Sequence, residues 1–454
     1  MKRPVSARTR VALALATAFC LHTAPALAGE DVKVLLEILL EKGIITQQEY
    51  ETKIKKVADA EEIKAFNQAQ DIRKASNDLE QRAEKERKFK TEFYGQASAG
   101  VYSASHMTST NSVATGMSDQ PKGNNRVGVK VSRELESDVT AMLTLESNFS
   151  LRTGAFGKDA GGYGYSAGGN PIFDREANIR LASKTYGTVI LGRGANLQND
   201  LSGAFDARQN WNFGGLKPIG RYVGFHSASG VNRADKIVRY ISPVFNGFNF
   251  DGGVAMGGVP VDSDQATSYY FGGRYKNGNF EAGYNHIEAN IGTGTSQTTT
   301  NNQVDFLAAK YTLDKLTMNG GYVMTRNPSS TPATFSTSKS DGKVEADTFF
   351  TGAVYRLTPQ MSINGAWYRV QDKTLQTVSN KNNDLTMIAT GLTWSPYKEW
   401  DFFIDYVRAA REEGATGAFT IFDKWIPDTG TNGTGYSESK KSQSGVSIGG
   451  QYKF

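Results

Sequence analysis

The chain has 454 residues, a formal net charge of +5 and a single cysteine, Cys20. Four of the basic residues lie among the first ten positions, so the rest of the chain carries only about +1, which excludes the basic footprint of a nucleic-acid-binding protein. The 48 glycines, 24 Phe and 20 Tyr residues, against only 12 prolines, favour many short strands that end in aromatic residues.

The first residues have the three parts of an export signal. The basic run MKRPVSARTR leads into the apolar VALALATAFCL, and APALA supplies small residues before Gly29. The sequence therefore predicts a signal peptide over residues 1–28, with cleavage after Ala28. A retained transmembrane anchor is the alternative, but the apolar run is too short to span a bilayer. Without Cys20 the mature chain has neither a disulfide nor a cysteine-based metal site.

Residues 29–92 have the composition of helices rather than strands. The run VKVLLEILLEKG ends at Gly43, and Thr46 with Glu49 has the capping-box spacing that begins a second helix. The stretch 58–90 lacks Pro and Gly and is dense in Glu, Lys, Arg, Gln and Ala, which predicts a helix of up to about thirty residues. Its sparse apolar stripe fits either a solvated single helix or a weak coiled coil joined to a trimeric barrel.

From Phe93 to the C-terminus, apolar residues recur with a period of two, which is typical of strands. In NNRVGVKVSRE, for example, Val127, Val129 and Val131 fall on one side and small or polar residues on the other. Sixteen such runs are predicted as strands, at residues 93–103, 125–134, 138–148, 173–183, 188–195, 236–245, 248–257, 267–276, 280–288, 303–313, 316–325, 344–357, 361–370, 385–395, 400–408 and 444–454.

The connections between these strands alternate between short and long. Short ones, such as Asn246 with Gly247, are tight-turn sequences, whereas the long ones run from about ten to forty residues and are rich in Ser, Thr, Gly and Asn. Short turns at one end, long loops at the other and an even strand number are the layout of an outer-membrane barrel. The expected fold is all-β: a 16-stranded antiparallel transmembrane β-barrel over residues 93–454, preceded by an α-helical periplasmic extension over residues 29–92.

The last run, SGVSIGGQYKF, places Val446, Ile448 and Tyr452 on one side and ends on Phe454. A terminal aromatic residue on an amphipathic last strand resembles the signal that the outer-membrane barrel assembly machinery reads. We therefore expect the chain to insert into outer-membrane lipid of a Gram-negative cell, with Phe454 as the membrane insertion signal.

One long connection, residues 196–235, differs from the others in its aromatic content. It contains Phe205, Trp211, Phe213, Tyr222 and Phe225. A loop of that length with its own apolar residues is expected to pack against another part of the protein, and such loops often carry function. We predict that this loop folds into the lumen of the barrel and narrows it.

Five runs, FYGQASAGVY, NNRVGVKVSRELESDVTAMLTLESNF, FDREANIRLASKTYGTVILGRGAN, KIVRYISPVFNGFNF and GGQYKF, together resemble the general porin family of Gram-negative bacteria in its beta-proteobacterial type. The resemblance covers about residues 93–454, and the helical segment before it is an addition to the family pattern. It implies a homotrimer of sixteen-stranded barrels whose third long loop constricts the pore. It also implies passive diffusion of small hydrophilic solutes, with no cofactor, metal or catalytic residue.

The resemblance further implies that arginines on the barrel wall face acidic residues on the inward loop. Arg193 in LGRGAN and Arg239 in VRYISP match two wall arginines, and Arg180 in NIRLAS is expected near them. The loop departs from the family at WNFGG, where Asn212 stands in place of the expected acid. The charges nearby are mostly basic, being Asp200, Asp206, Arg208, Lys217, Arg221 and Arg233.

We therefore predict a constriction with a mild anion preference. Its residues are Arg180, Arg193, Asp206, Arg208, Lys217, Arg221 and Arg239. The alternative is that several of these arginines pair with Asp206 and Asp235 and only hold the loop against the wall.

Three other functions stay open from the sequence. An outer-membrane hydrolase would need a base, and the sequence offers His226 beside Ser227, but side chains of sequence neighbours rarely meet as base and nucleophile, so we expect no enzyme. The channel could instead be specific for one solute class, such as dicarboxylates or phosphate. Residues 31–90 could also tether the barrel to peptidoglycan or to a periplasmic protein.

Overall fold

The computed structural model describes residues 24–87, 89–106, 113–136, 138–156, 172–223, 225, 233–256, 267–290, 301–327, 344–373, 384–412 and 442–454. By its contacts the chain divides into two compact units, Met1–Lys88 and Phe89–Phe454. Residues 1–23 of the predicted signal peptide, the pair His226 and Ser227, and residues 413–441 lie outside the described part.

Over its described residues, the first unit contains two helices, α2 (Ala24–Glu41) and α3 (Gln47–Arg87). After α2, Gly43 adopts a φ of +67°, which glycine tolerates without strain, and the Ile44 N–H donates to the Leu39 carbonyl at 3.0 Å. These contacts end the helix at the predicted turn. Neither helix, over its described residues, combines the length and apolarity that a membrane-crossing helix requires.

The predicted capping box begins α3. The Thr46 N–H donates to Glu49 Oε2 at 2.9 Å, and the Glu49 N–H donates to Thr46 Oγ1 at 3.3 Å. Hydrogen bonds from Thr46 lower the pKa of the exposed Glu49 carboxyl. The helix then continues without a break to Arg87, so the two helical stretches predicted after Gly43 form one helix of 41 residues.

The second unit is a single antiparallel sheet, with seventeen strands among the described residues. The strands are β1 (Lys90–Ala104), β2 (Ala114–Asp119), β3 (Arg126–Glu136), β4 (Val139–Asn148), β5 (Glu176–Ser183), β6 (Gly187–Ala195), β7 (Arg233–Ile241), β8 (Phe248–Ala255), β9 (Ser268–Asn277), β10 (Phe280–Asn290), β11 (Asn301–Leu313), β12 (Leu316–Asn327), β13 (Val344–Arg356), β14 (Met361–Asp372), β15 (Leu385–Tyr397), β16 (Trp400–Arg411) and β17 (Ser442–Lys453).

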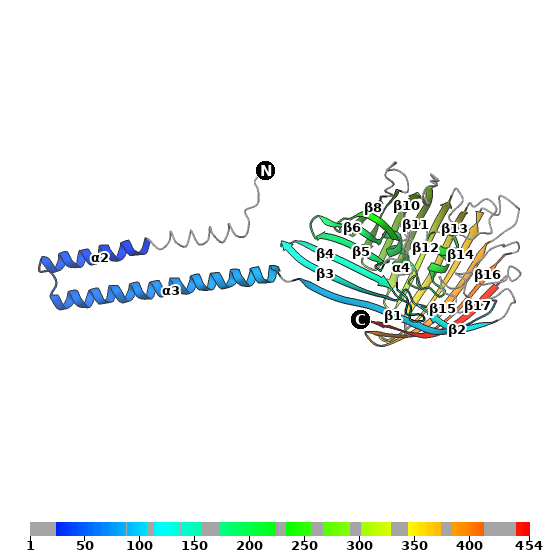
Figure 1. Cartoon of the computed structure of the whole chain (residues 1–454), viewed down its shortest axis with the longest axis horizontal. Helices are drawn as coiled ribbons and strands as arrows, with labels where there is room; N and C mark the ends of the chain where they lie inside the picture. Colours follow the sequence, from blue (N-terminus) through cyan, green and yellow to red (C-terminus); the bar gives the residue numbers. More distant parts are fainter. Residues whose placement is uncertain are drawn as a thin grey trace. The chain divides into compact units, whose positions relative to one another are not determined.

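The sheet closes into a ring (Figure 1). One edge of β1 pairs with β17, and the other edge pairs with β3 along its first half and with β2 along its second half. β2 and β3 therefore lie end to end at one position of the ring. The seventeen described strands thus fill sixteen positions, which is the predicted strand number. The sequence analysis missed β2 because residues 120–125 interrupt this position, with positive φ at Gln120 and Gly123. Closure pairs the backbone groups that an open sheet edge would expose to lipid.

The strands alternate as a membrane wall requires. In β16, Phe402, Ile404 and Tyr406 are exposed on the outside, whereas Phe403 and Val407 between them are buried inside. The predicted outward residues of the last strand, Val446, Ile448, Tyr452 and Phe454, are likewise exposed.

The C-terminal residue completes the seam of the barrel. The Gly95 N–H donates to the Phe454 carbonyl at 2.9 Å, and the Phe454 N–H donates to the Gly95 carbonyl at 3.2 Å. The Phe454 ring stacks on Tyr452, with centroids 5.8 Å apart. The terminal aromatic residue thus lies on the outer surface of the closing strand pair, β17 with β1.

The connection between β6 and β7 enters the barrel, as predicted, and forms α4 (Leu197–Phe205) and α5 (Leu216–Val223) (Figure 1). Asn196 caps α4, because its side chain accepts a hydrogen bond from the Asn199 N–H at 3.2 Å. α4 packs against β9–β12 and α5 packs against β13 and β14. β13 and β14 lie far from β6 and β7 along the ring, so the loop reaches them through the interior.

Apolar side chains hold the loop to this part of the wall. A Cβ at Gly283 would lie 2.6 Å from Leu201 and 2.8 Å from Phe205, so glycine at this position lets α4 approach the strand. Burying each large apolar side chain contributes about 1.5–3 kcal/mol. The large apolar loop residues that are at most 2% exposed are Leu197, Leu201, Phe205, Phe213, Leu216, Ile219, Val223 and Phe225. The inner face of β9–β16 is therefore largely apolar, unlike the polar interior expected of a barrel open to water.

Candidate functional site: the pore constriction

A cavity of about 530 Å³ remains between the inward loop and the opposite wall. Its charged residues are six cations and one carboxylate, namely Lys122, Arg126, Arg175, Lys217, Arg233, Lys453 and Asp401. Asn, Gln, Ser and Thr side chains supply most of the remaining lining. The described part of the lumen is thus polar and strongly positive at the point where the loop narrows it.

Three arginines form a cluster on one side of the cavity, Arg126, Arg175 and Arg233, which we call the arginine cluster. Arg126 is the first residue of β3, Arg175 immediately precedes β5 and Arg233 is the first residue of β7. The side chain of Arg126 is 36% exposed and that of Arg175 is 7% exposed, so Arg126 reaches furthest into the lumen.

Arg233 is the most isolated cation of the cluster. Only 6% of this residue is exposed, and its Nε has no hydrogen-bond partner among the described residues. A buried N–H group without a partner is costly, because it loses the hydrogen bond that water would provide. Arg233 thus brings a third guanidinium to the cavity lining, near the carboxylates of Glu146 and Glu176.

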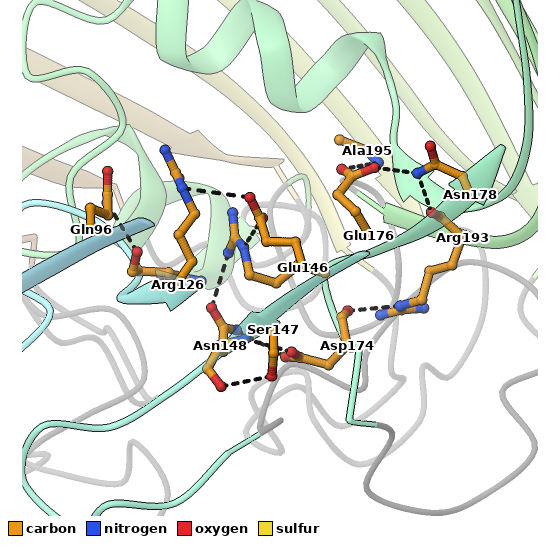
Figure 2. Close-up of polar contacts among 12 residues, drawn as sticks. Gln96, Arg126, Glu146, Ser147, Asn148, Asp174, Glu176, Asn178, Arg193 and Ala195 are labelled. Atoms are coloured by element: carbon orange, nitrogen blue, oxygen red, sulfur yellow. Dashed lines mark hydrogen bonds and ion pairs between the residues drawn. The ribbon is translucent and has the colours of Figure 1, made fainter. Parts of the chain in front are cut away.

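A network of acids and amides connects the cluster to the strands behind it (Figure 2). Glu146 binds Arg126, with Oε2 3.7 Å from Nε, and it also accepts a hydrogen bond from Arg175 Nε. The Asn148 side chain accepts a hydrogen bond from Arg175 at 3.1 Å and donates to Asp174 Oδ2 at 3.0 Å. The arginines are thus held by short side chains on strands, which fixes their positions in the wall.

Two lysines occupy the other side of the cavity. Lys122 Nζ lies 3.9 Å from the centre of the Trp211 ring and 4.8 Å from that of Phe403, and it donates to the Thr393 hydroxyl. Lys217 Nζ donates to Asn124 Oδ1 at 2.8 Å and to Asn212 Oδ1 at 2.7 Å. These two amino groups thus contact aromatic faces, a hydroxyl and amide oxygens.

Asn212, which stands where the family resemblance implied an acid, acts here as a hydrogen-bond donor. Its Nδ2 donates to the Gln120 carbonyl at 2.6 Å and to Asn124 Oδ1 at 3.2 Å. Close by, the Phe213 N–H donates to the Pro121 carbonyl at 3.1 Å. The inward loop thus docks onto the interruption between β2 and β3. A carboxylate at position 212 could not donate these bonds and would repel both acceptors.

Two of the predicted wall arginines lie outside the cavity lining and hold the root of the loop. Arg239 is buried, with Nη2 2.9 Å from Asp200 Oδ2, and it also bonds Asp251. Arg193 forms an ion pair with Asp235 and donates from Nε to the Asp174 carbonyl at 2.7 Å. Asp235, the partner of Arg193, is one of the two acids that the alternative named, whereas the partners of Arg239 are Asp200 and Asp251.

Asp206 and Arg208 also support the loop rather than line the cavity. Arg208 is fully buried, with Nη1 2.8 Å from Asp405 Oδ1 on β16. Asp206 accepts hydrogen bonds from the Tyr368 hydroxyl at 2.7 Å and from the Leu216 N–H at 2.8 Å. Burial raises the pKa of Asp206, and these hydrogen bonds partly oppose the shift.

The remaining predicted residues differ in position. Lys217 lines the cavity, as described above. Arg180, on β5, is about one third exposed and forms an ion pair of 3.1 Å with Glu176. The side chain of Arg221 lies outside the described residues.

The sequence analysis did not single out Lys122, Arg126 or Arg175, and it named Arg233 only as a loop charge. The alternation of side chains along a strand could have indicated two of them. Arg126 is on the same face of its strand as Gly128, and Arg233 is on the same face as Arg239. Lys122 and Arg175 lie just outside regular strands, where parity gives no guidance.

No group of three or more His, Cys, Asp and Glu side chains that could hold a metal ion occurs in the described part of the chain. The arrangement offers fixed charges, hydrogen-bonding groups and a restricted passage.

Comparisons with known proteins identify relatives of the barrel. A family model described as Gram-negative porin matches residues 65–414. An outer membrane porin protein of Bordetella pertussis is 26% identical over 196 residues, which is 40% of this chain and 46% of that protein. The alignment thus spans about half the length of this curated relative.

Solved structures share the fold at low sequence identity. An anion-selective porin from Comamonas acidovorans has a TM-score of 0.64 and 16% identity, covering 81% of this chain and all of that one. The outer membrane channel DcaP of Acinetobacter baumannii has a TM-score of 0.52 and 14% identity, covering 81% of this chain and 97% of that one.

Proposed function

The chain belongs to the Gram-negative porin family, and on that premise we propose that it is an outer-membrane porin through which small hydrophilic solutes diffuse passively, with a preference for anions. Members of this family are β-barrel channels of the outer membrane and not enzymes. Solutes move down their own gradient and are sorted by the width and charge of the constriction.

The excess of cations at the constriction carries this proposal. Six basic side chains and one carboxylate line the cavity of about 530 Å³. A cleft of one charge sign raises the local concentration of the opposite ion, because its low-dielectric walls focus the field. We therefore propose the arginine cluster, Lys122 and Lys217 as the residues that select anions, while Arg193, Arg208 and Arg239 hold the loop.

The reversal potential tests the ion preference directly. The purified full-length protein is inserted into a planar bilayer with a KCl gradient across it, and the zero-current voltage is measured. A zero-current voltage close to the equilibrium potential of chloride supports the proposal. A zero-current voltage close to the equilibrium potential of potassium contradicts it, since the described constriction would then not control the current.

A channel specific for one anionic solute class is the second candidate. The observation that favours it is the position of the arginine cluster and two lysines around one small cavity, which suits an oxyanion such as phosphate or a dicarboxylate. Chloride current measured during titration with inorganic phosphate or succinate distinguishes the two. Block at micromolar concentration indicates a dedicated binding site, whereas no saturation up to millimolar concentration indicates a general porin.

The outer surface supports assembly as a homotrimer. Strands β2–β6 contain no Phe, Tyr or Trp, and their exposed residues are aliphatic, among them Leu143, Ile179, Leu181, Val189 and Leu191. The described strands β13–β17 each expose at least one aromatic ring. Aromatic residues anchor a barrel at the two membrane interfaces, so the surface that lacks them suits contact with another copy rather than with lipid. Sedimentation or native mass measurement in detergent tests the trimer.

We also propose that the helices of the first unit associate between copies. Ile63, Phe66, Ile72 and Leu79 of α3 are each at least 41% exposed, and a coiled coil would cover them. A trimer would contain three such helices, one from each copy.

Deletion of residues 31–90 separates the functions of the two units. Unchanged conductance with weaker trimers supports the coiled coil, and unchanged conductance with altered attachment of the envelope supports a tether to peptidoglycan or to a periplasmic protein. Export through a signal peptide over residues 1–28, and insertion by the barrel assembly machinery through Phe454, complete the proposal.

A further inference from the structure

Three nearly buried acids, Glu146, Asp174 and Glu176, lie beside the arginine cluster among the described residues, and Glu146 is the one that contacts two of its members. Glu146, on β4, has a side chain that is only 8% exposed, and it lies between two members of the arginine cluster. Its Oε1 accepts a hydrogen bond from Arg175 Nε, and its Oε2 is 3.7 Å from Arg126 Nε (Figure 2). A single carboxylate thus serves two guanidinium groups.

The Glu146 side chain takes no part in the backbone pairing that forms the wall. The backbone pairing of β3 with β4 runs from Arg126 opposite Asn148 to Glu136 opposite Val139, and Glu146 contributes its side chain to none of these bonds. An acid here also costs desolvation energy, which its arginine partners must offset. Its contribution is electrostatic: with Glu146 ionised, the three charges of the cluster and this carboxylate sum to +2, and without it they sum to +3.

We propose that Glu146 is a specificity-determining residue of the channel, which limits its anion preference and positions Arg126 and Arg175 on the wall. This inference rests on the proposed function as an anion-preferring porin. The carboxylate weakens the positive field that the lumen presents to passing ions. It also keeps the partly exposed Arg126 guanidinium at the wall, so that the passage stays open.

The test replaces Glu146 by an uncharged side chain of the same shape. For Glu146→Gln, the ratio of chloride to potassium permeability should rise about twofold or more at 0.1 M salt, because one negative charge leaves the lumen. The difference should shrink at about 1 M salt, where the Debye length falls to about 3 Å. Glu146→Asp keeps the charge and should stay close to the wild-type ratio.

Two further variants separate charge from architecture. Glu288→Gln makes the same substitution on β10, on the outer surface of the barrel, and should leave the permeability ratio unchanged. The double variant Arg126→Gln with Glu146→Gln removes one charge of each sign, so its ratio should return toward the wild-type value. A purely structural role for Glu146 would not produce this compensation.

The selectivity of the wild type tests the proposed function, and the effect of Glu146→Gln tests the role of Glu146. A wild-type channel that prefers cations contradicts the proposed function. An anion-preferring wild type whose ratio is unaltered or lowered by Glu146→Gln overturns the inference alone. If Glu146→Gln does not assemble, the double variant is compared with Arg126→Gln: a higher anion preference in the double variant supports the inference, and equal values overturn it.

Discussion

The two halves of the inner wall of the barrel differ in polarity. Along β3–β7 the wall holds charged groups, with the arginine cluster lining the cavity and the nearly buried Glu146 in contact with two of its members. Along β9–β16 it is largely apolar, and residues such as Val304, Phe306 and Val323 are buried beneath the inward loop. One half therefore keeps its polar surface in water, and the other is covered by the chain itself.

This difference separates the width of the pore from its charge. Apolar packing positions the loop through many short-range contacts that ions in solution do not weaken. Fixed charges on the opposite wall act over about 10 Å at 0.1 M salt and are screened as the salt concentration rises. The width of the passage should thus depend on the apolar half and its ion preference on the charged half.

The largest expected effect comes from weakening the apolar half. Leu201→Ala removes a fully buried side chain of α4 and should cost the loop about 2–5 kcal/mol of its attachment. We expect a higher and noisier single-channel conductance, measured in planar bilayers. Leu307→Ala, on the outer surface of β11, is the matched control and should conduct like the wild type. Equal conductance of both variants would show that the loop does not limit the current.

Next in size is the loss of charge from the other half. Replacing all three residues of the arginine cluster by Gln should lower the chloride to potassium permeability ratio by about fivefold or more, with little change in conductance. The reversal potential measures this ratio. Arg408→Gln, which removes an exposed arginine of β16 that faces outward, should have no effect. If the control shifts the potential as much, surface charge and not the constriction sets the preference.

Asn212 is on the inward loop and binds Gln120 and Asn124, between β2 and β3. Its substitution should affect both the width of the passage and its ion preference. Asn212→Asp loses the hydrogen bond to the Gln120 carbonyl and adds an acid to the lumen. We expect the permeability ratio to fall by about twofold. Asn212→Ala loses the same bond without adding charge, so only the conductance should change. A similar ratio in both variants would assign the effect to loop position.

The smallest effect is expected outside the lumen, at the turn between β3 and β4. Hydrogen bonds from Ser183 and its neighbours lower the pKa of Asp138 to about 2. An ordinary carboxyl titrates near pH 4, so this group stabilises the folded barrel above about pH 4, and the contribution is lost as the pH falls through about 2.

Asp138→Asn should therefore lower the denaturation midpoint in guanidinium at pH 7. Below pH 2 the variant and the wild type should have equal midpoints. Ion selectivity should not change at any pH, since Asp138 does not line the cavity. A change in selectivity would mean that the charge of the turn reaches the pore.

The sequence by itself determined the secondary structure and the architecture. Alternation in runs such as NNRVGVKVSRE identified the strands, Thr46 with Glu49 located the start of α3, and the aromatic residues between β6 and β7 indicated a loop that packs inside. These features depend on residues close together in the chain and on the spacing of apolar side chains along it, so the linear sequence is enough to predict them.

Only the tertiary structure decided which cations face the lumen. Arg239 meets Asp200 and Asp251, and Arg208 meets Asp405, almost two hundred positions away in the chain, whereas Arg126 and Arg233 come to the same cavity. Each arginine has the same intrinsic charge, but its effect on a passing ion depends on whether an acid from another strand lies beside it. That proximity is set by how the closed ring and its inward loop fold together, which local sequence patterns do not encode.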